Sequence, residues 1–321
     1  MKSIGEVISL TFGDSGENHV GMEQIGVMVE PGEGFNLEDF KQYREIFNKK
    51  GCVVQIHHLN RILTSVGFNK KAEDAYVMVV RNGMNALLSD IGKTDKDIYK
   101  EMIAFEWDSK YYDVRRKKVL NKHARSNVCF SEGNSSEPDY ENKKGRMISF
   151  DDVPSLKHIK KQMAEQLGEK CQNLICEGNR YFDLKKCGIG WHGDKERRKV
   201  VAFRVGEDMN MQFNWFHRNS PIGPALKLTL NSGDMYLMSE KAVGTDWNKS
   251  SKITVRHSAG KAGCKYVSKE RFKKKVKTSS EKTPDVKSPE TPKKKKKLKI
   301  KKKKGTKLIK KTTSETPQKN L

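Results

Sequence analysis

The sequence predicts an α+β protein with an N-terminal α/β extension, an all-β barrel or double-sheet jelly roll, and a disordered basic C-terminal tail. Three observations predict this. Helix and strand patterns mix in the first part of the chain. From Cys171 onward, eight short strand-like segments follow one another with turn signals between them. The last fifty residues are dominated by lysine. We place the three regions at residues 1–125, 126–272 and 273–321.

The charge is unevenly distributed along the 321 residues. The net charge is +24, and Phe272–Leu321 holds 20 lysines but 4 acidic residues, so this segment carries +16 of the total. It has almost no apolar content, which predicts disorder. Lysine runs of this kind are typical of nucleic-acid-binding arms and nuclear localisation signals, and a solubilising tail is the alternative.

The chain has no recognisable targeting or membrane segment. Its N-terminus lacks the apolar run of a signal peptide, and no 18-residue apolar stretch occurs. The six cysteines form no CxxC pair and no zinc spacing. We expect reduced thiols in an intracellular protein, in the nucleus or another nucleic-acid-rich compartment, with no membrane partner. The oligomeric state is left open.

The first 105 residues combine strands and helices. The clearest helix is Leu37–Lys49, where apolar residues recur at helical spacing after a capping Asn36. The other expected elements are strands at Val7–Phe12, Ile25–Val29 and Ala75–Val80, and helices at Met84–Leu88 and Asp95–Phe105. The adjacent His57 and His58 diverge on either kind of element, so we expect partly exposed histidines and no metal site.

The composition of residues 109–150 predicts a basic connecting segment. Lys110–Arg125 interleaves cations with Tyr111, Tyr112 and His123, a mixture that suits phosphates and stacked bases but equally a solvated helix face. Short strands are expected at Val128–Phe130 and Met147–Phe150, and an amphipathic helix at Ser155–Leu167.

The strand-rich region begins at Cys171. Its expected strands are Asn173–Cys176, Gly188–His192, Val200–Val205, Met211–Phe216, Ala225–Leu230, Met235–Met238, Ile253–His257 and Cys264–Ser268. In a barrel or jelly roll, residues far apart in sequence converge at the mouth.

The motif at the centre of this region is His192-Gly-Asp194. On an extended segment, side chains two apart point to the same face, so an imidazole and a carboxylate would stand side by side. They are two-thirds of the 2-His-1-carboxylate facial triad that holds non-haem Fe(II). A solvated turn in a basic loop is the alternative for an isolated His-x-Asp.

The order of the surrounding motifs resembles that of AlkB-type 2-oxoglutarate/Fe(II) dioxygenases. The matching pieces, in chain order, are Asn179-Arg-Tyr181, His192-Gly-Asp194-Lys-Glu196, Gly233-Asp234, His257, and Lys265 six residues before Arg271. The resemblance covers roughly residues 173–271. It implies a double-stranded β-helix core and an oxidoreductase that uses Fe(II), 2-oxoglutarate and O2.

The resemblance also implies roles for individual residues. His192, Asp194 and His257 would bind the metal, and Asn179 and Tyr181 would donate hydrogen bonds to 2-oxoglutarate. Arg271 would bind the distal carboxylate of the cosubstrate, with Lys265 as a nearby point charge. The implied substrate is a nucleic-acid base, hydroxylated or oxidatively demethylated. A protein hydroxylase or demethylase, and a catalytically inactive jelly-roll module that binds nucleic acid, are the alternatives.

Two departures from the family pattern affect this assignment. Counted from Gly233-Asp234, the distal histidine should fall near Trp247, so a ten-residue insertion is needed to reach His257. Lysine also replaces the first arginine of the last motif. His217 competes as third ligand, although it precedes the Gly-Asp strand.

Overall fold

A computed structural model describes residues 5–260 of the chain, and it shows the mixed α+β architecture that the sequence predicts. Residues 261–321 lie outside the described part, and with them the expected strand at Cys264–Ser268, Lys265, Arg271 and the predicted tail. The strands are β1 Val7–Gly13, β2 Ser15–Glu17, β3 Gln24–Gly26, β4 Val54–His58, β5 Tyr76–Val80, β6 Lys110–Asp113, β7 Lys118–Asn121, β8 Ser126–Ser131, β9 Met147–Ser149, β10 Ile175–Tyr181, β11 Ile189–His192, β12 Val200–Gly206, β13 Met209–His217, β14 Ser220–Leu230, β15 Met235–Met238 and β16 Ile253–Ala259. The α-helices are α1 Leu37–Lys49, α2 Asn60–Ser65, α3 Gly83–Leu88, α4 Asp95–Ile103, α5 Pro154–Leu167 and α6 Glu240–Val243. Short 3-10 turns occupy Ser89–Ile91, Phe150–Asp152 and Glu169–Cys171.

The larger sheet has eight strands in the order β4-β5-β15-β12-β1-β10-β8-β9. All its ladders are antiparallel except that of β8 with β9. The N-terminal strand β1 lies between β10 and β12, more than 160 residues further along the chain. The sheet is therefore continuous across the predicted boundary at residue 125.

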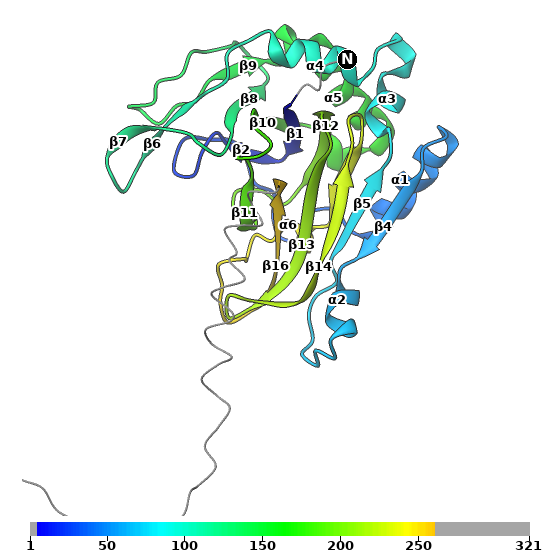
Figure 1. Cartoon of the computed structure of the whole chain (residues 1–321). Coiled ribbons are helices and arrows are strands. Elements are labelled where there is room, and N and C mark those ends of the chain that lie inside the picture. The colour runs from blue at the N-terminus through cyan, green and yellow to red at the C-terminus, as the bar shows by residue number, and fades with distance from the viewer. Residues whose placement is uncertain (1–4, 261–321) are drawn as a thin grey trace, which may run out of the picture. The chain divides into compact units, whose positions relative to one another are not determined.

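The smaller sheet has four antiparallel strands in the order β11-β16-β13-β14. It faces the larger sheet, because side chains of β13, β14 and β16 share one apolar cluster with side chains of β5, β12 and β15. Figure 1 shows this sheet beside β12 and β5.

The alternation of side chains along the central strands divides the core into two layers. On β12, Val200 and Ala202 face the smaller sheet, whereas Val201, Phe203 and Val205 face the helices. The outer layer is formed by α1, α3, α4 and α5, whose apolar residues pack on the larger sheet. Helix α1 has the predicted bounds, and Asn36 caps it by accepting the backbone N–H groups of Glu38 and Asp39.

The structure differs from the sequence-based expectation mainly in short elements. The basic segment Lys110–Arg125 forms a β-hairpin of β6 and β7, so the alternative of a helix face is wrong. Strand β4, which contains His57 and His58, was not expected, nor were α2 and α6. Strand β10 continues to Tyr181, five residues beyond the expected end.

Two further findings concern cysteines and membrane spans. The five cysteines within residues 5–260 are free thiols, as expected, and four of them are buried. Among the described residues, no helix has the length and apolar character needed to cross a bilayer.

Candidate metal centre

Three predicted residues come together where the smaller sheet meets the cavity. His192 ends β11, Asp194 follows it by two residues, and His257 lies on β16. One potential ligand atom from each of the three lies within 4.8 Å of the others. The Nε2 atoms of His192 and His257 are 3.6 and 3.4 Å from the same oxygen of Asp194.

The backbone brings these side chains together through strand pairing. His192 and His257 are direct cross-strand partners, and an irregularity in the register of β11 lies between Ile189 and His192. Bulges of this kind re-aim side chains next to functional sites. The amide of Asp194 donates to the carbonyl of Val243, 3.1 Å away, which fixes the turn that follows β11.

Gly193 allows this turn to approach the segment after α6. A Cβ added at Gly193 would lie 2.2 Å from the carbonyl oxygen of Gly244 and 2.9 Å from Cβ of Trp247. No side chain fits there without moving backbone. The glycine in the His-x-Asp motif is therefore required by packing.

The protonation of His192 and Asp194 suits metal binding. Burial, reinforced by the nearby His257, lowers the pKa of His192 to about 3, so its imidazole is neutral at physiological pH. Burial alone would raise the pKa of Asp194, but His257, Arg197 and His192 together hold it below its usual range. Metal ligands must be neutral imidazoles and ionised carboxylates.

The histidine tautomers are consistent with coordination through Nε2. The Nδ1 of His192 lies 2.7 Å from the carbonyl oxygen of Gly190 and can donate a hydrogen bond to it. This second contact fixes the ring and leaves Nε2 as the free lone pair. The Nδ1 of buried His257 has no partner among the described residues. Two imidazoles and one carboxylate beside a cavity fit an Fe(II) facial triad.

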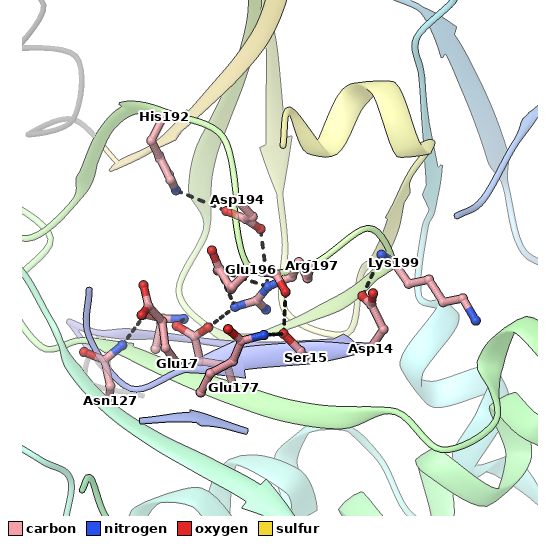
Figure 2. Close-up of polar contacts among 12 residues, drawn as sticks. Asp14, Ser15, Glu17, Asn127, Glu177, His192, Asp194, Glu196, Arg197 and Lys199 are labelled. Atoms are coloured by element: carbon pink, nitrogen blue, oxygen red, sulfur yellow. Dashed lines mark hydrogen bonds and ion pairs between the residues drawn. The ribbon is translucent and has the colours of Figure 1, made fainter. Parts of the chain in front are cut away.

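Arg197 contacts the Asp194 carboxylate on the side opposite the histidines (Figure 2). Its guanidinium is buried and pairs with Glu177 and, at 2.9 Å, with Glu196, while its Nε lies 3.6 Å from Asp194. The contact is to the Asp194 oxygen that faces away from the histidines. Arg197 thus restricts the rotation of Asp194 and neutralises the surrounding carboxylates.

A cavity of about 220 Å³ lies against the three residues. Its wall combines both sheets and the β2 region: Ser9, Thr11, Glu17, His19, Val20, Arg125, Glu177, Asn179, Tyr181, Ile189, His192, Gly193, Asp194, Lys195, Glu196, Arg197, Val200, Arg204, Met211, Tyr236, Met238, Trp247, His257 and Ala259. Both predicted cosubstrate residues of β10, Asn179 and Tyr181, belong to this wall.

Asn179 is fully engaged with neighbouring side chains. Its carbonyl oxygen accepts from Arg125 and Asn127, and its amide donates to Glu177 at 3.0 Å. Tyr181 stands beside another cavity residue, Arg204, whose guanidinium carbon is 5.9 Å from the centre of the tyrosine ring.

Within residues 5–260, Arg204 is a buried cation without an anionic partner. It is 1% exposed, its Nε and Nη1 have no hydrogen-bond partner among the described residues, and its Nη2 has the weak acceptor Met211 Sδ at 4.0 Å. Tyr181 and Tyr236 flank it. An isolated buried charge is costly unless it is paired, so this guanidinium is prepared for an anion.

Sequence reasoning missed Arg204 and Arg197, although one signal for Arg204 was available. It sits at an inward position of the otherwise apolar segment Val200–Val205, where a charge has no structural reason to be. The competing ligand His217 is placed at the far end of β13, opposite Ser220 and Ile253, and is not part of the cluster. Lys265 and Arg271, the two cations predicted to bind the cosubstrate, lie outside the described residues.

Comparison with known proteins gives one informative relative. No model of a known protein family matches the chain. The chain is 38% identical over 260 residues to "Uncharacterized protein R156" of Acanthamoeba polyphaga mimivirus, an alignment that covers 81% of this chain and 98% of the viral protein. With that identity over nearly the whole viral protein, the chain belongs to the same family as this mimivirus protein.

Proposed function

We propose that this protein is an AlkB-like, Fe(II)- and 2-oxoglutarate-dependent dioxygenase that hydroxylates or oxidatively demethylates a nucleic-acid base. The observation that carries the proposal is the convergence of His192, Asp194 and His257 on one point beside a cavity. Two histidines and one carboxylate are the ligand set of non-haem Fe(II) oxygenases.

The sheet arrangement supports a double-stranded β-helix core. Four adjacent strands of the larger sheet, β10-β1-β12-β15, face the four strands β11-β16-β13-β14. Two facing antiparallel sheets of four strands are the basic plan of a jelly roll. In this chain one of the eight strands, β1, comes from the N-terminus.

The cavity supports a dicarboxylate cosubstrate. Arg204 would bind the distal carboxylate of 2-oxoglutarate through its guanidinium, whose Nε and Nη1 have no hydrogen-bond partner within residues 5–260. The Tyr181 and Tyr236 rings would exclude water around that ion pair. Lys265 and Arg271 remain candidates for the same role.

The protein's part in the reaction is to hold and orient the metal and the cosubstrate. His192, Asp194 and His257 would bind Fe(II), and Arg197 would keep the Asp194 carboxylate in place. When bound, Fe(II) and 2-oxoglutarate, together with O2, would supply the oxidative chemistry: one oxygen atom of O2 converts a C–H bond of the substrate to C–OH, and the other enters succinate as 2-oxoglutarate loses CO2.

The decisive experiment measures succinate formation from 2-oxoglutarate with a panel of methylated oligonucleotides and a panel of peptides. Turnover stimulated by an oligonucleotide supports the proposal, whereas stimulation by peptides alone assigns a protein hydroxylase or demethylase. An anaerobic Fe(II) titration that shows no binding would leave a catalytically inactive module. His192→Ala and Asp194→Ala should abolish iron binding and turnover while the fold is retained.

A further inference from the structure

The β6–β7 hairpin carries a cluster of cations that form no ion pair with the other described residues. Exposed cations of its two strands and connecting loop are Lys110, Arg115, Arg116, Lys117 and Lys118. None of them forms an ion pair within residues 5–260. The one acidic residue of the hairpin, Asp113, accepts the backbone N–H of Arg116 and shapes the turn. Like charges this close repel one another, and no ion pair within residues 5–260 offsets the repulsion.

The lysines of helix α5 differ in this respect. Each has an acidic partner: Lys157 with Asp151, Lys160 with Glu132, and Lys161 with Glu165. In the hairpin, five exposed cations without an ion pair lie within residues 110–118. The concentration of unpaired charge therefore marks β6–β7 as a surface for an anionic partner.

The hairpin is packed against the rim of the cavity. The ring of His19, which lines the cavity, stacks on Tyr111 with 3.7 Å between the ring centres. Two residues further on, a Cβ at Gly21 would lie 2.8 Å from the side chain of Val114 in the hairpin loop. Four residues after β7, Arg125 enters the cavity wall. Figure 1 shows β6 and β7 beside the β2 segment.

The electrostatics of the rim agree with this placement. Burial, together with the charges of Lys122 and Arg125, lowers the pKa of His19 to about 4. Two cations, Lys122 and Arg125, thus act on His19 at the rim. Val20, next to His19 in the cavity wall, is 77% exposed, so an apolar surface also lies open at this point.

We propose that the β6–β7 hairpin binds the phosphodiester backbone of a single nucleic-acid strand at the mouth of the cavity. Arg115 and Arg116 contact phosphates, and the stacked pair His19 and Tyr111 offers an aromatic platform for a base. That the neighbouring base enters the cavity rests on the proposed function, but the phosphate contacts do not.

The test compares two charge reversals in the full-length protein. Arg115→Glu with Arg116→Glu alters the hairpin, and Lys70→Glu with Lys71→Glu alters an exposed segment between α2 and β5. In Figure 1, α2 lies on the opposite side of the view from β6 and β7. Both variants change the net charge equally, so the C-terminal lysines and overall charge are matched. Binding of a fluorescent single-stranded oligonucleotide is measured over a range of salt concentrations, without Fe(II) or 2-oxoglutarate.

The hairpin variant should bind at least tenfold more weakly at low salt. Its slope of log affinity against log salt should become less steep by about 1.4, since each lost phosphate contact removes about 0.7. The Lys70/Lys71 variant should keep the original slope. If the glutamates disturb folding, Arg115→Gln with Arg116→Gln removes the same contacts and should give the same slope.

Equal losses in the two charge-reversal variants would overturn the proposal, because overall charge would then explain binding. An unchanged slope in the hairpin variant would overturn it as well. The proposal would also be overturned if the hairpin variant lost binding to phosphatidylserine vesicles but kept binding to the oligonucleotide, because the hairpin would then be assigned to a membrane surface. If the hairpin variant loses oligonucleotide affinity as expected but the parent protein does not bind Fe(II), the proposed enzyme function is wrong and the hairpin site is still supported.

Discussion

His192 and His257 stand directly opposite each other on β11 and β16, and both direct Nε2 at the same oxygen of Asp194. Their ring centres are 4.4 Å apart, although 64 residues separate them in sequence. A cross-strand pair in a buried sheet has little freedom to change its separation. The geometry of the candidate metal centre is thus set by the register of two strands.

The first prediction concerns the third metal ligand. His257→Ala should lower Fe(II) affinity by at least about a hundredfold, since loss of even an outer contact of a ligand costs 10- to 100-fold. His217→Ala, outside the cluster, should leave it unchanged. Anaerobic Fe(II) titration measures both. If His217→Ala weakens binding and His257→Ala does not, the ligand assignment is reversed.

The second prediction concerns Arg204. In Arg204→Met, 2-oxoglutarate would lose its charge partner in a buried site, an effect of about 3 kcal/mol or roughly a hundredfold increase in KM. The melting temperature should stay the same or rise, because the arginine has no anionic partner within the described part of the chain. Steady-state kinetics and thermal unfolding test the two parts.

Arg256→Met is the matched control for Arg204. Arg256 is also buried, but its guanidinium donates to Asn219 and to the carbonyl of Trp247. Its removal should lower stability and leave KM unchanged. Lys265→Ala and Arg271→Ala belong in the same series. A KM that rises in Arg271→Ala and not in Arg204→Met would return the anchoring role to Arg271.

The third prediction is a pH dependence of stability at Glu17. Burial, and then the charge of Glu196, raise the pKa of Glu17 from 4.5 to about 7. The folded state therefore favours the protonated form, and the stability that this form contributes is present below pH 4.5 and lost as pH rises through 7. Glu17→Gln should melt a few degrees higher than the parent at pH 8 and equally at pH 4.5. The exposed Glu23→Gln should show no such trend.

Much of the fold is readable in the sequence because its elements have strong local signals. Helix α1 combines a capping Asn36 with apolar residues at helical spacing, and the central strands alternate or are continuously apolar. The β6–β7 hairpin was missed because each of its strands has four residues, begins with an exposed lysine and buries little, so no clear alternation marks it. Its structure depends on packing against the His19 loop.

The site shows the same division between local and distant information. His192 and Asp194 are recognisable from their spacing, and His257 from its place in the order of motifs. No local pattern in the sequence predicts that β1 lies between β10 and β12. Nor does any predict that Arg204 on β12 lies beside Tyr181 on β10. Such relationships arise from strand order, which periodicity does not encode.

The fourth prediction concerns residues 273–321. Their deletion should weaken nucleic-acid binding and flatten its salt dependence, because fewer counterions are released. Turnover of 2-oxoglutarate without substrate should be spared. The salt slope of oligonucleotide binding is the measurement, and a slope that does not change would limit the segment to solubility or localisation.

The fifth prediction tests whether the backbone around the ligands, and not their identity alone, sets metal affinity. Gly193 lies between His192 and Asp194, and a methyl group there would collide with the carbonyl oxygen of Gly244. Gly193→Ala would therefore separate the two backbone segments and strain the hydrogen bond from Asp194 to Val243.

The expected result for Gly193→Ala is a loss of Fe(II) affinity by roughly 10- to 100-fold, the range for changes outside the ligand set. All three ligands are retained, so the loss would reflect the position of Asp194. Lys195→Ala is the control, since its side chain lies over Trp247, 5.6 Å from the ring centre, and outside the ligand cluster. Equal Fe(II) affinity in Gly193→Ala and the parent protein would show that the turn can open without moving Asp194. In that case Arg197, which contacts the other Asp194 oxygen, would be the stronger constraint on the carboxylate.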